Sequence, residues 1–484
     1  MTSMLKTDLV DELTEVAEKH PGRLAIVHNG QTLSYSQLSS LAQAVAQRLG
    51  PLPGMVGTYA THSPGTVVAL FGIWAAGGAY CPIDPAFPEE RQRAMLAAAG
   101  CNKVLASQEG LALPPGIEAI QLAEIQADPE AGRVMWAAPN SPAYCLFTSG
   151  STGEPKPVIT SRRAIGTTVP SLRELFDIVP GDRVLQFASL NWDTCFEEIL
   201  PTLTAGATLV FHSEAHTGSF PRFLRMLAIE QITVVNLPTA FWHELVHFLT
   251  DEQAELPPMV RLVIIGGEAV NPTRLADWAK LPTASIRLLN TYGCTETTLI
   301  THAIDLPGPI FPVPIGSPLP HVMQLISEES ELLIGGPSLA DGYLGRPDAT
   351  AARFVTVHSG RFFRTGDRVS VGPGGVLLHD GRIDHQVKIR GIRVDPAEVE
   401  AQIAAHPGVS EVAVTGYTVA DHTALVAYVV PRPHAPAKLD IDIIDFLRIR
   451  VPAHLIPSRI RIVTELVYTT SGKVDRRGLK EAHP

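Results

Sequence analysis

The chain has 484 residues, of which 45% are hydrophobic and 18% are charged, and its formal net charge is −11. This apolar content is enough for large packed cores and excludes an intrinsically disordered chain. The length predicts at least two folding units. The acidic balance disfavours non-specific nucleic-acid binding, which needs a basic surface, so we expect no nucleic-acid partner.

The N-terminal segment 1–20 predicts an amphipathic helix, because acidic residues are mixed with apolar ones and no signal-peptide pattern occurs. The most apolar segment, Val67 to Ile83, contains three glycines and predicts a buried helix leading into a strand rather than a membrane span. The five cysteines never form a C-x-x-C pair, which is typical of a reducing compartment. We therefore expect a cytoplasmic protein that does not bind membranes.

Short apolar runs rich in valine and isoleucine follow one another in the middle of the chain, with helical patterns such as 220–231 between them. These runs are 183–187, 208–211, 233–237 and 260–265. Buried strands that alternate with helices predict an α/β fold with layered, largely parallel sheets.

The pattern changes after about residue 360, where glycine-rich turns such as 371–375 begin to cluster. A compact α+β unit then follows. Its predicted elements are a helix at 396–405, strands at 409–417 and 424–431, and a helix at 440–450. We place a large N-terminal domain at residues 1–382 and a small C-terminal domain at 383–484.

A glycine-rich loop follows the predicted strand 143–147. It comprises Thr148, Ser149, Gly150, Ser151, Thr152, Gly153, Glu154, Pro155 and Lys156. Its glycines allow backbone N–H groups to turn toward anionic oxygens, its hydroxyls add donors, and Lys156 adds positive charge. It lacks the Gly-Lys-Ser/Thr of a Walker A loop. The alternative is a flexible Ser/Gly linker, which explains neither the preceding strand nor the Pro-Lys ending.

The loop resembles the phosphate loop of the adenylate-forming superfamily, which includes acyl-CoA synthetases, luciferases and the adenylation domains of nonribosomal peptide synthesis. Other motifs of that superfamily follow in the same order along the chain. They are 76–84, 290–296, 363–367, 381–391 and 471–476. The chain is similar to a freestanding adenylation domain of the nonribosomal-peptide-synthetase type, with a mobile C-terminal domain.

The resemblance implies ATP and Mg²⁺ as cofactors, with Thr148 to Gly153 and Lys156 on the β- and γ-phosphates. Lys473 would bridge the substrate carboxylate and AMP and stabilise the transition state. The other nucleotide contacts that it implies are Gly267, Glu268, Asn290 and Tyr292 around the adenine, Thr295 at the α-phosphate, Glu296 on Mg²⁺, Asp367 on the ribose hydroxyls, and Arg382.

The resemblance also implies an amino-acid pocket in which Asp193 pairs with the substrate amino group; the alternative is that Asp193 caps a helix. The other pocket positions are Thr194, Glu197, Asn236, Ile264, Gly266, Thr291, Leu299 and Ile300, closed by Lys473. A second carboxylate, Glu197, suggests a second cation on the substrate. We expect a diamino acid such as lysine, β-lysine or ornithine, unless Glu197 pairs with a cation of the protein.

No carrier domain follows Lys473 in this sequence, so we expect a separate phosphopantetheinylated carrier protein as the acceptor, and a small activator protein is a further candidate partner. Asp384 matches the family's hinge position. The resemblance implies that rotation about it withdraws Lys473 and brings the loop Lys388 to Arg393 to the site.

Two alternatives remain open at this point. An acyl- or aryl-CoA ligase would share the fold and use coenzyme A as acceptor. A zinc metalloprotease would use the string from His243 to His247, which reads His-Glu-x-x-His, with Glu268 as a third ligand.

Overall fold

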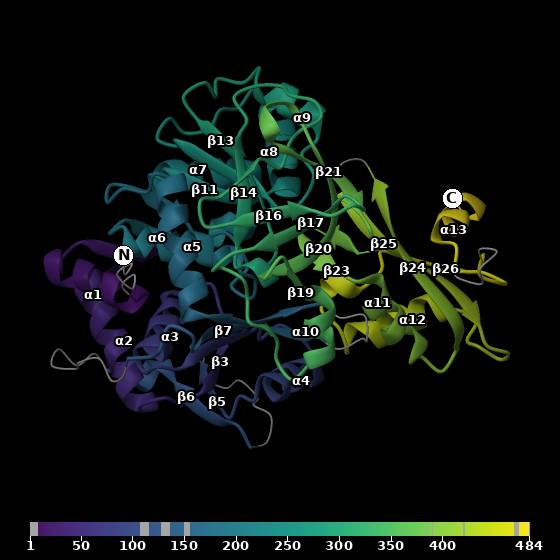
Figure 1. Ribbon diagram of the computed structural model, residues 1–484, viewed down its shortest axis with the longest axis horizontal. Helices are drawn as coiled ribbons and strands as arrows, with labels where there is room; N and C mark the ends of the chain where they lie inside the picture. Colours follow the sequence, from purple (N-terminus) through teal and green to yellow (C-terminus); the bar gives the residue numbers. More distant parts are fainter. Residues whose placement is uncertain are drawn as a thin grey trace.

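The structure, a computed structural model, describes residues 8–106, 116–126, 136–149, 155–384, 386–389, 391–419, 422–468 and 474–483. Figure 1 shows a large body built from the N-terminal and middle parts of the chain, with a smaller lobe at the C-terminal end. The predicted fold class, a layered α/β body with a small α+β unit, is confirmed.

Nine strands form the largest sheet, whose inner strands run parallel and whose outer strands are antiparallel. Their order is β15 (Ser317–Pro318), β14 (Ile300–Asp305), β13 (Arg287–Gly293), β12 (Leu262–Gly266), β11 (Val234–Pro238), β9 (Arg183–Leu185), β10 (Thr208–Phe211), β1 (Leu24–His28) and β2 (Gln31–Ser34). One face is covered by α7 (Phe220–Ile229), α8 (Thr239–Asp251) and α9 (Pro272–Trp278). The four predicted Val- and Ile-rich strands are therefore parallel neighbours in one sheet.

A seven-stranded sheet lies beside it and is parallel from β7 to β6. Its order is β18 (Gly342–Tyr343), β8 (Lys156–Ser161), β7 (Pro142–Thr148), β4 (Ala79–Ile83), β3 (Met55–Tyr59), β5 (Lys103–Ala106) and β6 (Glu118–Gln121), with α4 (Glu89–Ala99) packed on its outer face. The apolar segment 67–83 forms most of α3 (Pro64–Ala75) and then β4, as predicted. Within the described ranges, no helix combines the length and apolarity that crossing a bilayer requires.

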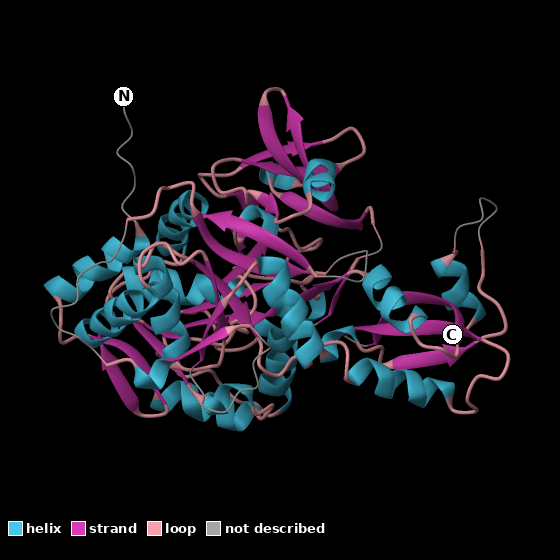
Figure 2. Ribbon diagram, turned by 90° about the horizontal axis from the view of Figure 1, so that it is seen from below, coloured by secondary structure: helices cyan, strands magenta, loops and turns pink. Residues whose placement is uncertain are grey.

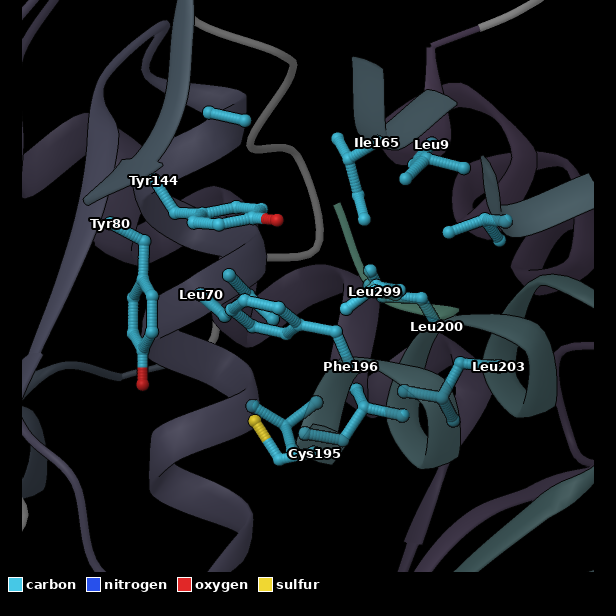
Figure 3. Packing of buried hydrophobic residues seen from close by; sticks show 14 of the residues in the cluster. Leu9, Leu70, Tyr80, Tyr144, Ile165, Cys195, Phe196, Leu200, Leu203 and Leu299 are labelled. Atoms are coloured by element: carbon cyan, nitrogen blue, oxygen red, sulfur yellow. The ribbon is translucent and has the colours of Figure 1, made fainter. Parts of the chain in front are cut away.

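A layer of helices separates the two sheets, and one core cluster draws side chains from both sheets and from these helices. The helices are α1 (Leu9–Lys19), α2 (Tyr35–Leu49), α3, α5 (Arg162–Leu175) and α6 (Thr194–Thr204). Figure 3 shows Phe196 of α6 between aromatic rings of the seven-stranded sheet, 4.8 Å from Tyr144 and 6.1 Å from Tyr80 between ring centroids. Tight packing along α6 fixes the helix that begins at the predicted amino-acid pocket.

The remaining strands form smaller antiparallel sheets and the C-terminal lobe (Figure 2). The body ends with β16 (Met323–Ile326), β17 (Glu331–Gly335), α10 (Pro347–Arg353), β19 (Phe354–Val357), β20 (Gly360–Val371) and β21 (Leu377–Arg382). The lobe contains the hairpin β22 (Val387–Ile389) and β23 (Ile392–Val394), α11 (Pro396–Ala404), β24 (Val409–Val419), β25 (His422–Pro431), α12 (Leu439–Arg448), β26 (Arg459–Ile462) and α13 (Arg476–Ala482). The predicted C-terminal helices and strands occur in the predicted order.

Candidate active site

A cavity of about 310 Å³ opens at the carboxyl ends of the parallel strands β11, β12 and β13, facing the hairpin β22–β23. This edge is where open α/β sheets bind ligands. The predicted site residues that line it are Thr148, Asp193, Thr194, Glu197, Asn236, Gly266, Gly267, Thr291, Thr295, Glu296, Leu299, Ile300, Asp367 and Arg382. The fold thus gathers residues from the phosphate loop and from the motifs 290–296, 363–367 and 381–391 around one space, together with the predicted pocket residues.

The substrate side of the cavity carries two carboxylates on one helix. Glu197 lies one turn after Asp193, so both side chains point to the same face of α6. Asp193 sits at the position before the helix but makes no side-chain capping hydrogen bond, which argues against the capping alternative. Glu197 is buried, and Asn236 Nδ2 donates to its Oε2 at 3.0 Å. Among the described residues, no lysine or arginine forms an ion pair with either carboxylate.

Burial controls the protonation of this pair. Loss of solvation raises the pKa of Glu197 to about 8, and the charge of Asp193 adds to the rise. Burial likewise raises the pKa of Asp193 to about 6, where the nearby Glu296 contributes in the same direction and a hydrogen bond from Thr295 opposes it. At pH 7, without a bound cation, Glu197 is therefore mostly protonated and Asp193 is mostly ionised, and a cation between them would favour the ionised form of both.

Strained backbone shapes the opposite wall of the pocket. Thr298 and Leu299 both have positive φ, 63° and 68°, a conformation that costs a non-glycine residue about 1–3 kcal/mol. Gly293 allows this turn, because a Cβ at that position would lie 2.2 Å from the Leu299 carbonyl oxygen. The turn places Leu299 and Ile300 in the cavity lining.

The nucleotide side of the cavity contains a carboxylate that is fully paired within the protein. Asp367 accepts hydrogen bonds from the Tyr292 hydroxyl at 2.6 Å and from Arg382 Nη1 at 2.6 Å, and His379 Nε2 lies 3.1 Å from the same oxygen as Arg382. Burial alone would raise the pKa of Asp367, but His379 and Arg382 hold it well below its usual range. His379 was not predicted; it reaches Asp367 only because β20 and β21 pair.

Glu296 is a second buried and paired carboxylate at this end. Its exposed fraction is 2%; the Tyr343 hydroxyl donates to Oε1 at 2.8 Å, and Arg393 Nη1 lies 3.4 Å from Oε2. Burial would raise the pKa of Glu296, yet the charge of Arg393 and the Tyr343 hydrogen bond lower it. A single carboxylate that lines the same cavity as Thr148 fits Mg²⁺, which takes one or two carboxylates together with phosphate and water oxygens.

The hairpin β22–β23 forms the remaining wall of the cavity. Lys388, Gly391, Ile392 and Arg393 all line it, and the Gly391 N–H donates to Glu268 Oε1 at 2.5 Å. The loop predicted to approach the site is therefore at the site in this structure.

A second cavity, about 30 Å³, shares Thr148, Trp192 and Arg393 with the main cavity. It lies between the body and the lobe, which are joined at this point by an ion pair of 2.9 Å between Arg91 and Glu398. The second cavity thus lies at the junction of the two parts, next to the main cavity.

Several predicted residues lie outside the main cavity. Ile264 was predicted in the pocket, but it is buried in the core and does not line the cavity, because its strand reaches the cavity only at Gly266. Asn290 was predicted on the adenine rim, but its Nδ2 donates to the Pro314 carbonyl at 2.8 Å, away from the cavity. Tyr292 is buried behind the lining with its hydroxyl on Asp367.

Four further residues lie beside the cavity. Ser149 lines the second cavity, and Lys156 lines a neighbouring one together with Asp384. Asp384 is held by Arg382 through two hydrogen bonds of 2.6 and 2.8 Å. Glu268 contacts the hairpin as described above. The predicted Gly150, Ser151, Thr152, Gly153 and Lys473 lie outside the described residues.

Two family models account for most of the chain. Residues 13–344 match the AMP-binding enzyme family, and residues 398–473 match the AMP-binding enzyme C-terminal domain. The chain belongs to the AMP-binding enzyme family. It is an ATP-dependent ligase of the adenylate-forming superfamily.

Curated relatives of this AMP-binding enzyme are longer proteins. It is 39% identical over 494 residues to an isonitrile lipopeptide synthase from Streptomyces coeruleorubidus, a match covering 98% of this chain and 33% of that protein. It is 32% identical over 491 residues to bacitracin synthase 3 from Bacillus licheniformis, covering 96% of this chain and 8% of that protein. The chain thus spans a third or less of the length of these relatives.

Solved structures show the same architecture. A malonyl-CoA ligase with methylmalonyl-CoA and AMP bound is 28% identical, with a TM-score of 0.80 over 92% of this chain and 97% of that one. IdnL1 is 26% identical, with a TM-score of 0.81 over 96% of this chain and 100% of that one. An artificially fused adenylation–PCP di-domain from Klebsiella oxytoca, 23% identical, shares the fold with a TM-score of 0.84 over 95% of this chain and 94% of that one.

The zinc alternative finds no support in the AMP-binding enzyme. His243 is buried and its Nε2 accepts the Asn271 N–H at 2.9 Å, whereas His247 is exposed and lies 3.3 Å from Asp251. A search of the described ranges found no group of three or more side chains suited to hold a metal ion.

Proposed function

We propose that this adenylation enzyme activates an aliphatic diamino acid, such as lysine, β-lysine or ornithine, with ATP and Mg²⁺, and passes the aminoacyl group to the phosphopantetheine thiol of a carrier protein. One observation carries the substrate proposal: Asp193 and Glu197 face the same cavity from one helix turn and form no ion pair with a described lysine or arginine.

The physical argument rests on the cost of buried charge. A buried carboxylate is stable as an anion only with a partner that replaces its lost hydration. Positions one helix turn apart hold their Cβ atoms about 5–6 Å apart, so two ammonium groups on one substrate can each meet one carboxylate. A neutral amino acid would pair with Asp193 alone and leave Glu197 protonated or uncompensated.

The residues on the nucleotide side would act mainly by positioning and charge neutralisation. Asp367 would hold the ribose, Glu296 would bind Mg²⁺, Thr295 would contact the α-phosphate, and Lys473 would neutralise charge as the carboxylate attacks. Bound Mg²⁺ would offset charge on the phosphates. Catalysis would need no protein nucleophile.

The second half-reaction would use the lobe. We place the domain boundary at 382/383 and the hinge at Asp384, between β21, which pairs within the body, and β22, which packs on β25 of the lobe. The narrow second cavity is a route for a thiol arm, and the similarity to an adenylation–PCP di-domain supports a carrier protein as acceptor. A small activator protein would be a further partner, bound in addition to the carrier protein.

The test is ATP–pyrophosphate exchange with ornithine, lysine, β-lysine, neutral amino acids and aryl or fatty acids as the panel. We expect exchange with the diamino acids, and we expect E197Q to lower kcat/KM for lysine about 10–100-fold relative to a neutral amino acid. The matched control is E214Q, which removes a carboxylate of the surface pair with Arg222. Wild-type exchange with neutral amino acids only would discard the role of Glu197; exchange with aryl or fatty acids only would favour the acyl-CoA ligase alternative.

A further inference from the structure

The nucleotide-side carboxylate Glu296 needs a positive partner to stay ionised, because it is only 2% exposed where it lines the cavity. In this structure that partner comes from the lobe: Arg393 Nη1 lies 3.4 Å from Glu296 Oε2, and the Arg393 side chain is itself mostly buried, with an exposed fraction of 18%. Tyr343 supplies the other oxygen with a neutral hydrogen bond only.

The same short segment of the lobe engages other groups predicted to contact ATP. Ser149 Oγ donates to the Arg393 carbonyl at 3.0 Å and accepts the Asp395 N–H at 3.1 Å. Glu268 accepts the Gly391 N–H. A phosphate-loop hydroxyl, an adenine-rim carboxylate and the magnesium carboxylate are therefore all occupied by residues 391–395, which form one edge of the junction at β23 (Figure 1).

We infer that Arg393 replaces Mg²⁺ as the counter-charge of Glu296 after pyrophosphate leaves, and so acts as a positioning residue for thioester formation. The inference rests on the proposed magnesium role of Glu296. A guanidinium suits this exchange, because it stays charged when buried and presents several donors in a fixed plane. Because a guanidinium 3.4 Å from Oε2 and a metal ion on the same carboxylate would repel each other, magnesium with pyrophosphate disfavours the docked hairpin, and the docked hairpin disfavours magnesium.

A purely structural role for Arg393 makes a different prediction. Its Nε donates to Gln386 Oε1 at 2.5 Å, so the side chain also braces the hairpin. In that case a neutral residue that preserves this hydrogen bond would keep the hairpin as protected from exchange as in the wild type. Charge and bracing can therefore be separated with R393Q, which keeps a polar side chain, and R393K, which keeps the charge.

The experiment is hydrogen–deuterium exchange of peptides covering β22–β23 in the whole chain, with magnesium pyrophosphate as the probe and magnesium chloride alone as reference. In the wild type, we expect slow exchange that speeds up about tenfold when magnesium pyrophosphate is added. R393Q should exchange fast with or without the probe, and R393K should retain part of both the protection and the response. The ratio of thioester formation to ATP–pyrophosphate exchange should fall about tenfold in R393Q.

The matched control is R91Q, which breaks a different ion pair between body and lobe, Arg91–Glu398, without touching Glu296. Its hairpin should exchange faster than wild type but still respond to magnesium pyrophosphate. A wild-type hairpin indifferent to the probe, or an R393Q hairpin as protected as wild type, would overturn the inference. Because this readout uses no amino acid, its failure is distinguishable from failure of the proposed substrate, which the exchange panel reports.

Discussion

The two ends of the cavity both contain buried carboxylates, but they are neutralised in different ways. On the nucleotide side, Asp367 is held by Arg382 and His379, and Glu296 by Arg393. On the substrate side, Asp193 and Glu197 have no described cationic partner, and their pKa values are raised rather than lowered. The difference separates acids whose partner is built into the fold from acids whose partner would arrive with the ligand.

The largest effect is expected when the amine anchor is removed. D193N would leave the substrate ammonium without its charge partner, so kcat/KM for every amino acid in ATP–pyrophosphate exchange should fall about 100-fold or more. The KM for ATP should change less than about twofold, since Asp193 faces the substrate end. An equal rise in the KM for ATP would contradict the separation of the two sides.

The next largest effect should come from the paired side. D367N would remove a charged hydrogen-bond acceptor from the predicted ribose site, which should raise the KM for ATP about 10–100-fold. The preference for diamino over neutral amino acids should stay constant, because Asp367 lies among nucleotide-side residues. Steady-state kinetics, with the concentrations of ATP and amino acid varied in turn, measures the KM for ATP and the amino-acid preference separately. A changed amino-acid preference in D367N would contradict the separation of the two sides.

The pH dependence of substrate binding sharpens the comparison further. The Glu197 carboxyl keeps its proton up to about pH 8 in the empty pocket, whereas a diammonium substrate binds its ionised form. The apparent Kd for lysine should therefore fall about tenfold as pH rises from 7 to above 8, with release of a proton. Calorimetry in two buffers of different ionisation enthalpy measures both the Kd and the number of protons released. Above pH 7, E197Q should show neither the fall in Kd nor the proton release.

The smallest effect concerns stability, and its sign differs between the two sides. The folded-state pKa of Glu197 lies above its unfolded value, so its burial destabilises the protein increasingly as pH rises from about 4.5 to about 8. E197Q should therefore raise the thermal midpoint at pH 8 by roughly 2–4 °C and leave it unchanged near pH 4.5.

Asp367 has a depressed pKa, so its stabilisation is present above its unfolded pKa and is lost in acid. D367N should therefore lower the thermal midpoint at pH 8. Scanning fluorimetry at both pH values compares the variants.

The sequence predicted those parts of the fold that local patterns encode. The run 208–211 became β10 with the same bounds, and the segment 67–83 became a helix followed by a strand, with Gly77 and Gly78 between the two apolar stretches. The motif spacing also brought Asp193, Glu197 and Asp367 to one cavity. These features depend on residues close in sequence or on motif order.

Other features depend on contacts that no local pattern carries. Ile264 lies too far inside β12 to line the cavity. The Asn290 side chain donates a hydrogen bond to the Pro314 carbonyl of a later loop. His379 joins Asp367 through strand pairing, and Arg393 joins Glu296 only because the lobe rests on the body. The contact between the hairpin β22–β23 and Glu296 therefore could not be predicted from the sequence alone.

The position of α6 in the middle helix layer has a consequence for retargeting the enzyme. One side of this helix is held in the core by Phe196 (Figure 3), while Glu197 lines the cavity. If the proposed substrate role of Glu197 holds, recognition depends on one face of a rigidly packed helix, and replacing Glu197 with a neutral side chain should change the preferred substrate without disturbing the core. Libraries meant to redirect such enzymes to new building blocks can concentrate their diversity on that face and leave the inner face fixed.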